Sequence, residues 1–271
     1  MTTPAAVFER LAQRSGNGPA VVAHRGDSAR LPENTLPAFA SALRLGVPMQ
    51  EFDVRATRDG VLVCLHDATL DRTTDAPQRL GPGALVAETT WAETRQLDAG
   101  AGRDVADGPV RIPSLAEVLA LLAPDCIAMI EHKAGRPESY LTELRRCGAL
   151  GRSILQSFDW DFVTAARRHE PGLACALLGP NRANPRLDRQ AIRAALDVGA
   201  GMLHWQAGDV TREAVVACHE AGLRLCTYTT DDDLGLCGGA ALGLDAMCTN
   251  RPARMLELAA DRWCAPRSAP A

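Results

Sequence analysis

Imidazole and basic side chains end two short apolar runs of this chain, where a strand could present them to a substrate. His24 and Arg25 follow the run over residues 20–23, and His66 follows the run over residues 61–65. An imidazole is the commonest general acid or base, and an arginine can stabilise negative charge that develops in a transition state. The two histidines therefore indicate one group that accepts a proton and another that donates one.

Acidic side chains lie in two further apolar runs, residues 50–54 and 126–133. Side chains alternate between the faces of a strand, so Glu51 and Asp53 would share one face. The same alternation predicts that Glu131 and Lys133 lie together and that His132 points to the opposite face. Lys133 is also the only lysine of the chain. Two strands are thus expected to carry three carboxylates and one ammonium group.

Each of these patterns alone is more often structural than catalytic, because short motifs recur by chance. Three carboxylates inside apolar strands are harder to explain structurally, since they repel each other and lose their hydration. A divalent cation would compensate them, and all-oxygen ligation favours Mg²⁺ or Ca²⁺ over zinc. A metal ion, two imidazoles and the cations Arg25 and Lys133 together favour cleavage of a phosphate ester. The residues therefore predict a metal-dependent phosphodiesterase.

These residues must be positioned by a regular alternation of strands and helices. Thr35 is a plausible N-cap of a helix, and Ser114 with Glu117 forms a capping-box pattern. The expected strands cover residues 20–24, 50–54, 61–65, 126–133, 152–157, 173–178, 200–205, 223–228 and 245–249. About eight strand–helix units in a chain of this length predict an α/β fold, a closed (β/α)₈ TIM barrel with catalytic residues at the carboxyl ends of its strands. An open doubly wound sheet is the alternative, because one sequence does not reveal strand order.

One segment, residues 68–110, is too long for an ordinary connection and is punctuated by Gly81-Pro82-Gly83 and Gly100-Ala101-Gly102. We expect it to form a small insertion between an early strand and its helix, over one end of the barrel. Residues 1–271 are then expected to form a single barrel domain with this insertion.

Composition narrows the class of protein further. The net charge is -4 and the pI is about 5.9, so the basic footprint of a nucleic-acid-binding protein is missing. Nine scattered cysteines without a C-x-x-C pair favour free buried thiols in a reducing compartment. Glu9 and Arg10 interrupt any signal-peptide pattern, and no apolar run approaches the length of a membrane span. We expect a cytoplasmic protein without stable membrane insertion, and the oligomeric state stays open.

Five motifs in series resemble those of the glycerophosphodiester phosphodiesterase family. The match is dense over residues 20–75, returns weakly at Ser157-Phe158 and again over residues 245–252. The five motifs are His24-Arg25-Gly26, Pro32-Glu33-Asn34-Thr35, Glu51-x-Asp53-Val54 with Thr57-x-Asp59-Gly60, His66-Asp67 with Leu70-x-Arg72-Thr73-Thr74, and Glu131-x-Lys133.

The resemblance implies a TIM-barrel enzyme that cleaves glycerophosphodiesters to sn-glycerol 3-phosphate and an alcohol. In such an enzyme the glycerol hydroxyl next to the ester is a plausible internal nucleophile, which would give a cyclic phosphate before hydrolysis. The resemblance implies these roles by position: His24 and His66 as the acid and base, Glu51, Asp53 and Glu131 as metal ligands, and Arg25 and Lys133 as phosphate contacts.

Three positions depart from the family pattern. Tyr228 lies where a tryptophan is usual, Asn250 replaces an aspartate, and His132 replaces an aliphatic residue. The alternatives are a lysophospholipase D or sphingomyelinase D-like phosphodiesterase on the same barrel, or a barrel that binds a phosphodiester without turnover. The segment 68–110 has a single aromatic residue, Trp91, which favours a water-soluble small-molecule substrate.

Overall fold

A computed structural model describes residues 4–14, 18–100, 108–122, 124 and 126–262. Eight parallel strands close into a barrel in the order β1-β9-β8-β7-β6-β5-β4-β2, and β1 pairs with β2 to complete the ring. This closure confirms the TIM barrel and excludes the open sheet. The barrel strands are β1 (Ala20–His24), β2 (Met49–Ala56), β4 (Ile127–His132), β5 (Ser153–Ser157), β6 (Ala174–Gly179), β7 (Met202–Gln206), β8 (Arg224–Tyr228) and β9 (Ala246–Thr249).

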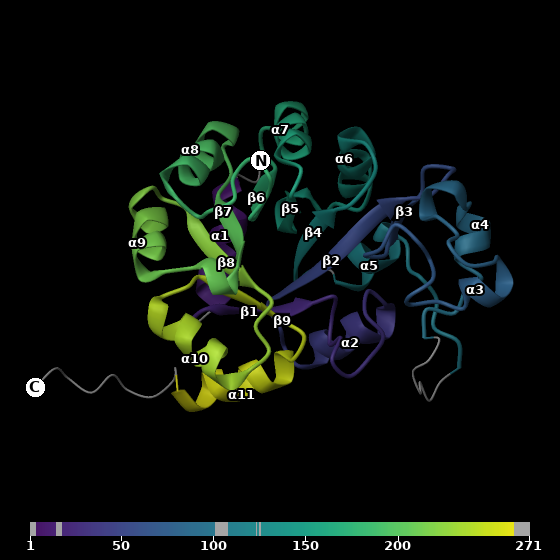
Figure 1. The fold of residues 1–271 in the computed structure, drawn as a ribbon, viewed down its shortest axis with the longest axis horizontal. Helices are drawn as coiled ribbons and strands as arrows, with labels where there is room; N and C mark the ends of the chain where they lie inside the picture. The colour runs from purple at the N-terminus through teal and green to yellow at the C-terminus, as the bar shows by residue number, and fades with distance from the viewer. Residues whose placement is uncertain (1–3, 15–17, 101–107, 123, 125, 263–271) are drawn as a thin grey trace, which may run out of the picture.

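Helices surround the barrel and connect successive strands (Figure 1). Two of the expected caps are present: the Thr35 side chain accepts from Ala38 N, and Ser114 and Glu117 form a reciprocal capping box. The helices around the barrel are α2 (Leu36–Arg44), α5 (Leu115–Leu121), α6 (Pro137–Arg146), α7 (Trp160–His169), α8 (Arg189–Val198), α9 (Arg212–Glu220), α10 (Asp233–Leu242) and α11 (Pro252–Arg262), the last of which follows the final strand. Their apolar faces bury the outer side of the sheet, so both faces of each barrel strand are covered.

The barrel interior changes character along the strands. Near the amino ends it is filled by apolar side chains, among them Val22, Met49, Ile154 and Met202. A helix that the sequence analysis did not identify, α1 (Pro4–Arg14), closes this end by packing Val7, Phe8 and Leu11 into the same cluster. The polar residues of the interior therefore lie toward the carboxyl ends.

The run over residues 61–65 forms β3 (Leu62–Cys64), which pairs with β2 antiparallel and does not belong to the barrel. Residues 57–61 form the turn of this hairpin, and Thr57 Oγ1 donates to Asp59 Oδ1 over 2.7 Å. An apolar run of this length reads the same in either direction, so periodicity alone could not distinguish a hairpin return from a parallel strand.

The segment after β3 packs beside the barrel as a small layer of its own (Figure 1). It contains α3 (Ala76–Arg79), a 3-10 turn η1 (Val86–Glu88) and α4 (Trp91–Thr94). Leu70, Val86 and Leu97 form an apolar cluster with residues of β3. This agrees with an insertion between an early strand and its helix, although residues 101–107 of the expected segment lie outside the described residues.

Two further sequence predictions can be compared with the described part of the chain. Every cysteine described there has a free thiol, and most of these thiols are buried, whereas Cys264 lies outside the described residues. None of the described helices is both long and apolar enough to cross a bilayer.

Candidate active site

The first segment of the candidate site is a tight turn after β1 that packs against α2. Arg25 and Gly26 both have positive φ values, 56° and 81°. A Cβ at Gly26 would lie 2.7 Å from the backbone carbon of Ala38, so the turn requires glycine for close approach as well as for its dihedral angle. Asn34, with φ 58°, donates from Nδ2 to Asp53 Oδ2 over 2.9 Å. The turn thereby fixes His24 and Arg25 beside the carboxylates of β2.

Three acidic side chains meet in the interior of the barrel. Glu51, Asp53 and Glu131 each offer a carboxylate oxygen, and these oxygens lie within 4.8 Å of one another. All three residues are buried, at 2%, 0% and 7% exposed, and neither carboxylate oxygen of Glu51 has a hydrogen-bond partner. Orphaned buried carboxylate oxygens are costly, and a hard divalent cation is the ligand that suits such a donor set. These residues therefore fit Mg²⁺ or Ca²⁺.

The pKa values of Glu51, Asp53 and Glu131 are shifted because the three carboxyl groups are buried close together. Burial, followed by repulsion from Asp53 and Glu131, raises the pKa of Glu51 well above its ordinary value. Burial and then Asp53 raise the pKa of Glu131 to about 7. Burial also acts to raise the pKa of Asp53, but Arg25 and Lys133 outweigh it and lower that pKa. Positive charge added at this point would favour the ionised form of all three groups.

Two cations of the chain flank the triad. Arg25 Nε lies 2.9 Å from Asp53 Oδ2, and Arg25 Nη1 donates to Glu33 Oε1 over 2.8 Å. Lys133 Nζ lies 3.3 Å from Asp53 Oδ1 and forms a short ion pair with Glu131. Both side chains keep a little solvent contact, at 16% and 14% exposed. They are therefore held firmly and still open to a ligand on the solvent side.

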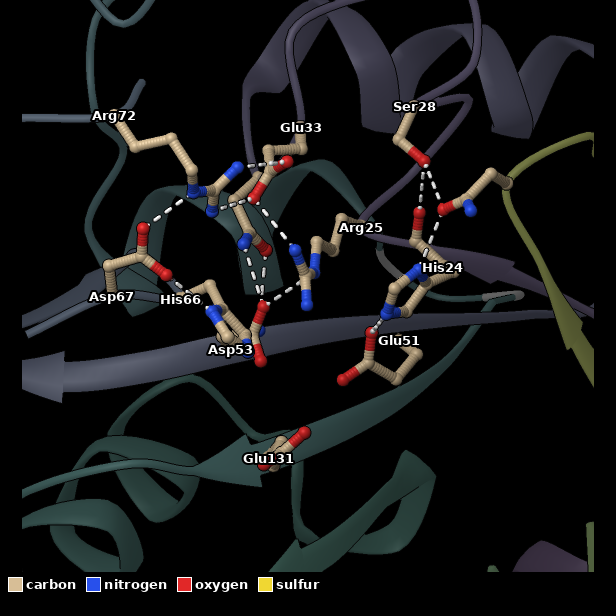
Figure 2. Close-up of polar contacts among 12 residues, drawn as sticks. His24, Arg25, Ser28, Glu33, Glu51, Asp53, His66, Asp67, Arg72 and Glu131 are labelled. Atoms are coloured by element: carbon tan, nitrogen blue, oxygen red, sulfur yellow. Dashed lines mark hydrogen bonds and ion pairs between the residues drawn. The ribbon is translucent and has the colours of Figure 1, made fainter. Parts of the chain in front are cut away.

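His24 is held by an amide whose own orientation is fixed. Asn250 Nδ2 donates to Asp231 Oδ2 over 2.6 Å, which turns Oδ1 toward His24 Nδ1 at 2.7 Å. Nδ1 must then carry the hydrogen, and Nε2 remains as the acceptor, 3.9 Å from Glu51 Oε2 (Figure 2). Burial and then Arg25 lower the pKa of His24, which favours the neutral imidazole.

His66 has a different support. Its Nδ1 lies 2.6 Å from Asp67 Oδ1, and Asp67 Oδ2 accepts from Arg72 Nε over 2.5 Å. Arg72 also reaches Glu33 with two hydrogen bonds, of 2.9 and 2.7 Å (Figure 2). The hydrogen bond from Arg72 is the main cause that lowers the pKa of Asp67 to about 2, so this residue is a carboxylate near neutral pH. The antiparallel hairpin of β2 and β3 places His66 beside Asp53, because the preceding residue, Leu65, donates from its backbone N to Asp53 O over 3.1 Å.

Comparisons with known proteins show the family of this chain. A profile of the glycerophosphoryl diester phosphodiesterase family matches residues 24–254. The chain belongs to this family. A glycerophosphodiester phosphodiesterase from Caldanaerobacter subterraneus subsp. tengcongensis is 32% identical over 251 residues, which are 88% of this chain and 96% of that protein.

Solved structures of the family share the fold. A structure from Silicibacter pomeroyi is 31% identical, with a TM-score of 0.84 over 94% of this chain and 98% of that chain. A glycerophosphodiester phosphodiesterase from Agrobacterium tumefaciens is 26% identical, with a TM-score of 0.75 over 86% of this chain and 97% of that chain. The recognition of the family from its motifs is thereby confirmed.

The seven residues chosen from the sequence gather at one end of the barrel. His24, Arg25, Glu51, Asp53 and Glu131 lie on strands or directly after them, and His66 and Lys133 complete the group. His132 points away, as alternation predicted, and stacks on Phe162 with ring centroids 3.5 Å apart. The ring of Tyr228 contacts Phe158 and His204, with centroids 6.0 and 5.1 Å away.

The sequence analysis did not identify which residues hold the two histidines, and it named Asn250 only as a departure from the family pattern. Asn250 follows β9 and Asp231 lies shortly after β8, so the criterion that selected His24 would have selected them as well. Asp67 and Arg72 were quoted only as part of a motif. Their contacts depend on which loops meet in the closed barrel, and that information is not local to either segment.

Proposed function

We propose that this protein hydrolyses glycerophosphodiesters to sn-glycerol 3-phosphate and an alcohol, with one divalent cation bound by Glu51, Asp53 and Glu131. The observation that carries the proposal is a buried cluster of three carboxylates beside two histidines whose Nδ1 atoms are both engaged. The 32% identical relative, a glycerophosphodiester phosphodiesterase, supports the substrate class.

The cation would supply positive charge against phosphate oxygens as negative charge develops on them. Arg25 and Lys133 would add fixed positive charge on the solvent side of the same phosphate. Both are already oriented by carboxylates, so little reorganisation is needed when a phosphate binds. This pre-organisation would lower the cost of holding the phosphate in place.

The unequal surroundings of the histidines support different starting roles. His24, held by the amide of Asn250, would use Nε2 to accept the proton of the glycerol hydroxyl next to the ester. His66, held by the carboxylate of Asp67, would start as an imidazolium ion and donate its proton to the leaving alcohol. The hydroxyl oxygen bonds to phosphorus as the bond to the alcohol oxygen breaks, which leaves a cyclic phosphate.

Hydrolysis of the cyclic phosphate would reverse the two roles. His66, now neutral, would take a proton from the attacking water, and His24 would return its proton to the glycerol oxygen as the ring opens. The net reaction consumes one water and restores both histidines. No serine or cysteine nucleophile is required.

A panel of substrates tests the proposal: glycerophosphocholine, glycerophosphoethanolamine, glycerophosphoglycerol and lysophosphatidylcholine, with detection of glycerol 3-phosphate after Mg²⁺ or Ca²⁺ is added. We expect glycerol 3-phosphate from at least one water-soluble diester. Choline phosphate as the product would contradict the proposed site of cleavage. Binding of all four compounds without turnover would favour the alternative of a non-catalytic barrel.

A further inference from the structure

Arg55 is a cation near the active site to which the proposed reaction assigns no role. Side chains alternate on β2, so Arg55 lies on the same face as Glu51 and Asp53. Val54 is the last residue of β2 that pairs with the barrel strand β4, which places Arg55 just beyond the barrel wall. Its side chain is half-buried. Arg55 therefore lies at the rim of the barrel mouth, on the face that carries two of the three carboxylates.

Among the described residues, the guanidinium group of Arg55 forms a single hydrogen bond. Its Nε donates to the backbone O of His66 over 2.9 Å. Arg25 and Arg72 differ from it, because each of them forms ion pairs with two carboxylates. The two Nη groups of Arg55 have neither a hydrogen bond nor an ion pair with any part of the chain that the structure describes. Their N–H donors are therefore available to a ligand.

The acidic groups near Arg55 are already paired with other cations. Asp67 accepts a hydrogen bond from Arg72, and Asp53 lies 2.9 Å from Arg25 Nε. Burial lowers the pKa of Arg55 in spite of the nearby charges of Asp53 and Asp67. The side chain nevertheless keeps its charge, because an arginine is not deprotonated in proteins. A cation that has lost part of its hydration without gaining a counter-ion would be stabilised by an anionic ligand.

The leaving alcohol of the proposed reaction would lie on the same side of the site as Arg55. His24 and His66 lie on opposite sides of Arg25 in Figure 2, and the attacking and leaving oxygens of a phosphoryl transfer are roughly in line. Because Asp67 holds Nδ1 of His66, the proton for the alcohol would come from Nε2. The hydrogen bond to the backbone O keeps the guanidinium group of Arg55 beside the same histidine. The headgroup of a bound diester would thus pass close to Arg55.

We propose that Arg55 binds an anionic group on the leaving alcohol, so that the enzyme prefers glycerophosphodiesters whose headgroup carries a carboxylate. The inference rests on the proposed function and adds the class of headgroup to it. The two Nη groups form a planar fork that matches the geometry of a carboxylate. Serine is a small alcohol of this class, because its carboxylate lies only a few bonds from the oxygen that leaves. Arg55 would then determine specificity without taking part in the chemical steps.

The test compares glycerophosphoserine with glycerophosphoethanolamine, with Mg²⁺ or Ca²⁺ present. Both headgroups carry an ammonium group, and they differ only in the carboxylate. A hydrogen bond between charged groups at a half-buried site contributes about tenfold in affinity, so kcat/KM of the unmodified enzyme should be roughly tenfold higher for glycerophosphoserine. In the Arg55→Gln variant this ratio should fall to about one. The change should appear in KM rather than in kcat, because the contact is the same before and during bond cleavage.

Matched variants separate recognition of the headgroup from support of His66. Glutamine retains an N–H donor for the backbone O of His66, so Arg55→Gln removes the charge without removing every possible anchor. If Arg55 only supported His66, kcat would fall alike for both substrates and their ratio would stay unchanged, which would overturn the inference. Arg58→Gln removes one positive charge from the same hairpin at a side chain that is 61% exposed. It should leave the ratio within about twofold, because solvent and salt screen an exposed charge.

A second measurement on the unmodified enzyme keeps the inference testable if Arg55→Gln folds poorly. Raising the salt concentration from about 0.01 to 1 M should lower the preference for glycerophosphoserine, because a contact between two charges at the rim is screened. A preference that does not respond to salt would overturn the inference. Turnover of both substrates with equal kcat/KM would also overturn it and would leave the proposed function intact. Absence of turnover with every diester would instead contradict the proposed function.

Discussion

At the scale of single residues, His24 and His66 differ in the group that hydrogen-bonds to Nδ1 of the imidazole ring. Asn250 presents a neutral amide oxygen to His24, whereas Asp67 presents a carboxylate to His66. A carboxylate stabilises an imidazolium ion far better than an amide does, because the hydrogen bond is then between two charges. This difference leads to two predictions about single substitutions.

The first concerns the leaving group. Replacing either histidine with alanine should lower kcat for glycerophosphocholine by about 10² to 10⁴. With p-nitrophenol as the leaving group, which departs without a proton, His66→Ala should recover most of its activity and His24→Ala should not. Equal recovery in both variants would contradict the assignment of His66 as the acid.

The second concerns Asp231, which touches neither histidine. Asp231→Asn removes the carboxylate that orients the amide of Asn250, so the His24 tautomer is no longer fixed. We expect kcat to fall by roughly tenfold with little change in KM, since small misplacements of a catalytic group are costly. Nitrogen NMR of His24 should show a mixture of tautomers. Asp233→Asn, which changes an exposed ion pair with Arg254, is the control.

Substitution of Lys133 tests whether positive charge alone is enough at the proposed phosphate site. Its ammonium group contacts Asp53 and Glu131 in a confined space. Lys133→Arg keeps the charge but introduces a planar fork, so kcat/KM should fall by about 10² or more. Arg58→Lys, at a side chain that is 61% exposed, should change it little. Similar small effects at both positions would show that geometry at Lys133 does not matter.

At the scale of elements, the turn between β1 and α2 carries the strictest steric requirement. Gly26 and Gly60 have almost the same positive φ, 81° and 82°, but only Gly26 has no room for a Cβ. Gly60→Ala should therefore cost only the strain of its dihedral angle, about 1 kcal/mol. Gly26→Ala should cost more, about 2 to 4 kcal/mol. Urea unfolding of both variants measures the difference, and equal losses would contradict the steric argument.

The sequence predicted the elements that local patterns determine. It did not predict contacts between segments that are distant along the chain. Strand ends located His24 and Glu131, and alternation correctly separated His132 from Lys133. The same reasoning located β3 but could not predict that it lies outside the barrel, because its direction is set by pairing with β2 and not by the run itself. Asn250 and Asp231 meet only because β8 and β9 are neighbours in the closed ring.

At the scale of the whole molecule, the triad couples stability to pH. The pKa of Glu131 is about 7 when folded without metal, above the ordinary value of 4.5. Below about pH 4.5, Glu131 is protonated in both the folded and the unfolded protein, so it does not lower the free energy of unfolding. Between about pH 4.5 and 7 the folded protein holds more protons than the unfolded chain, so its stability falls as the pH rises. A bound cation would oppose this loss, since it favours the carboxylates.

This coupling gives a prediction about the metal. Dialysis against EDTA should abolish turnover, and Mg²⁺ or Ca²⁺ should restore it. Between pH 5 and 7 the Tm of the metal-free protein should fall, and the increase in Tm on adding Mg²⁺ or Ca²⁺ should grow over the same interval. In the Glu131→Gln variant, the Tm of the metal-free protein should depend less on pH. The increase in Tm on adding metal should also be smaller. Full activity in excess EDTA would contradict the proposed cation.

Helix α1 determines how molecules reach and leave the reaction centre. Because Val7, Phe8 and Leu11 fill the amino end of the barrel, no route through that end is open within the described residues. Diester, water, alcohol and glycerol phosphate would all have to share the opposite mouth. Each product would then have to leave before the next substrate could bind. Product release would limit the turnover number as much as the chemical steps do.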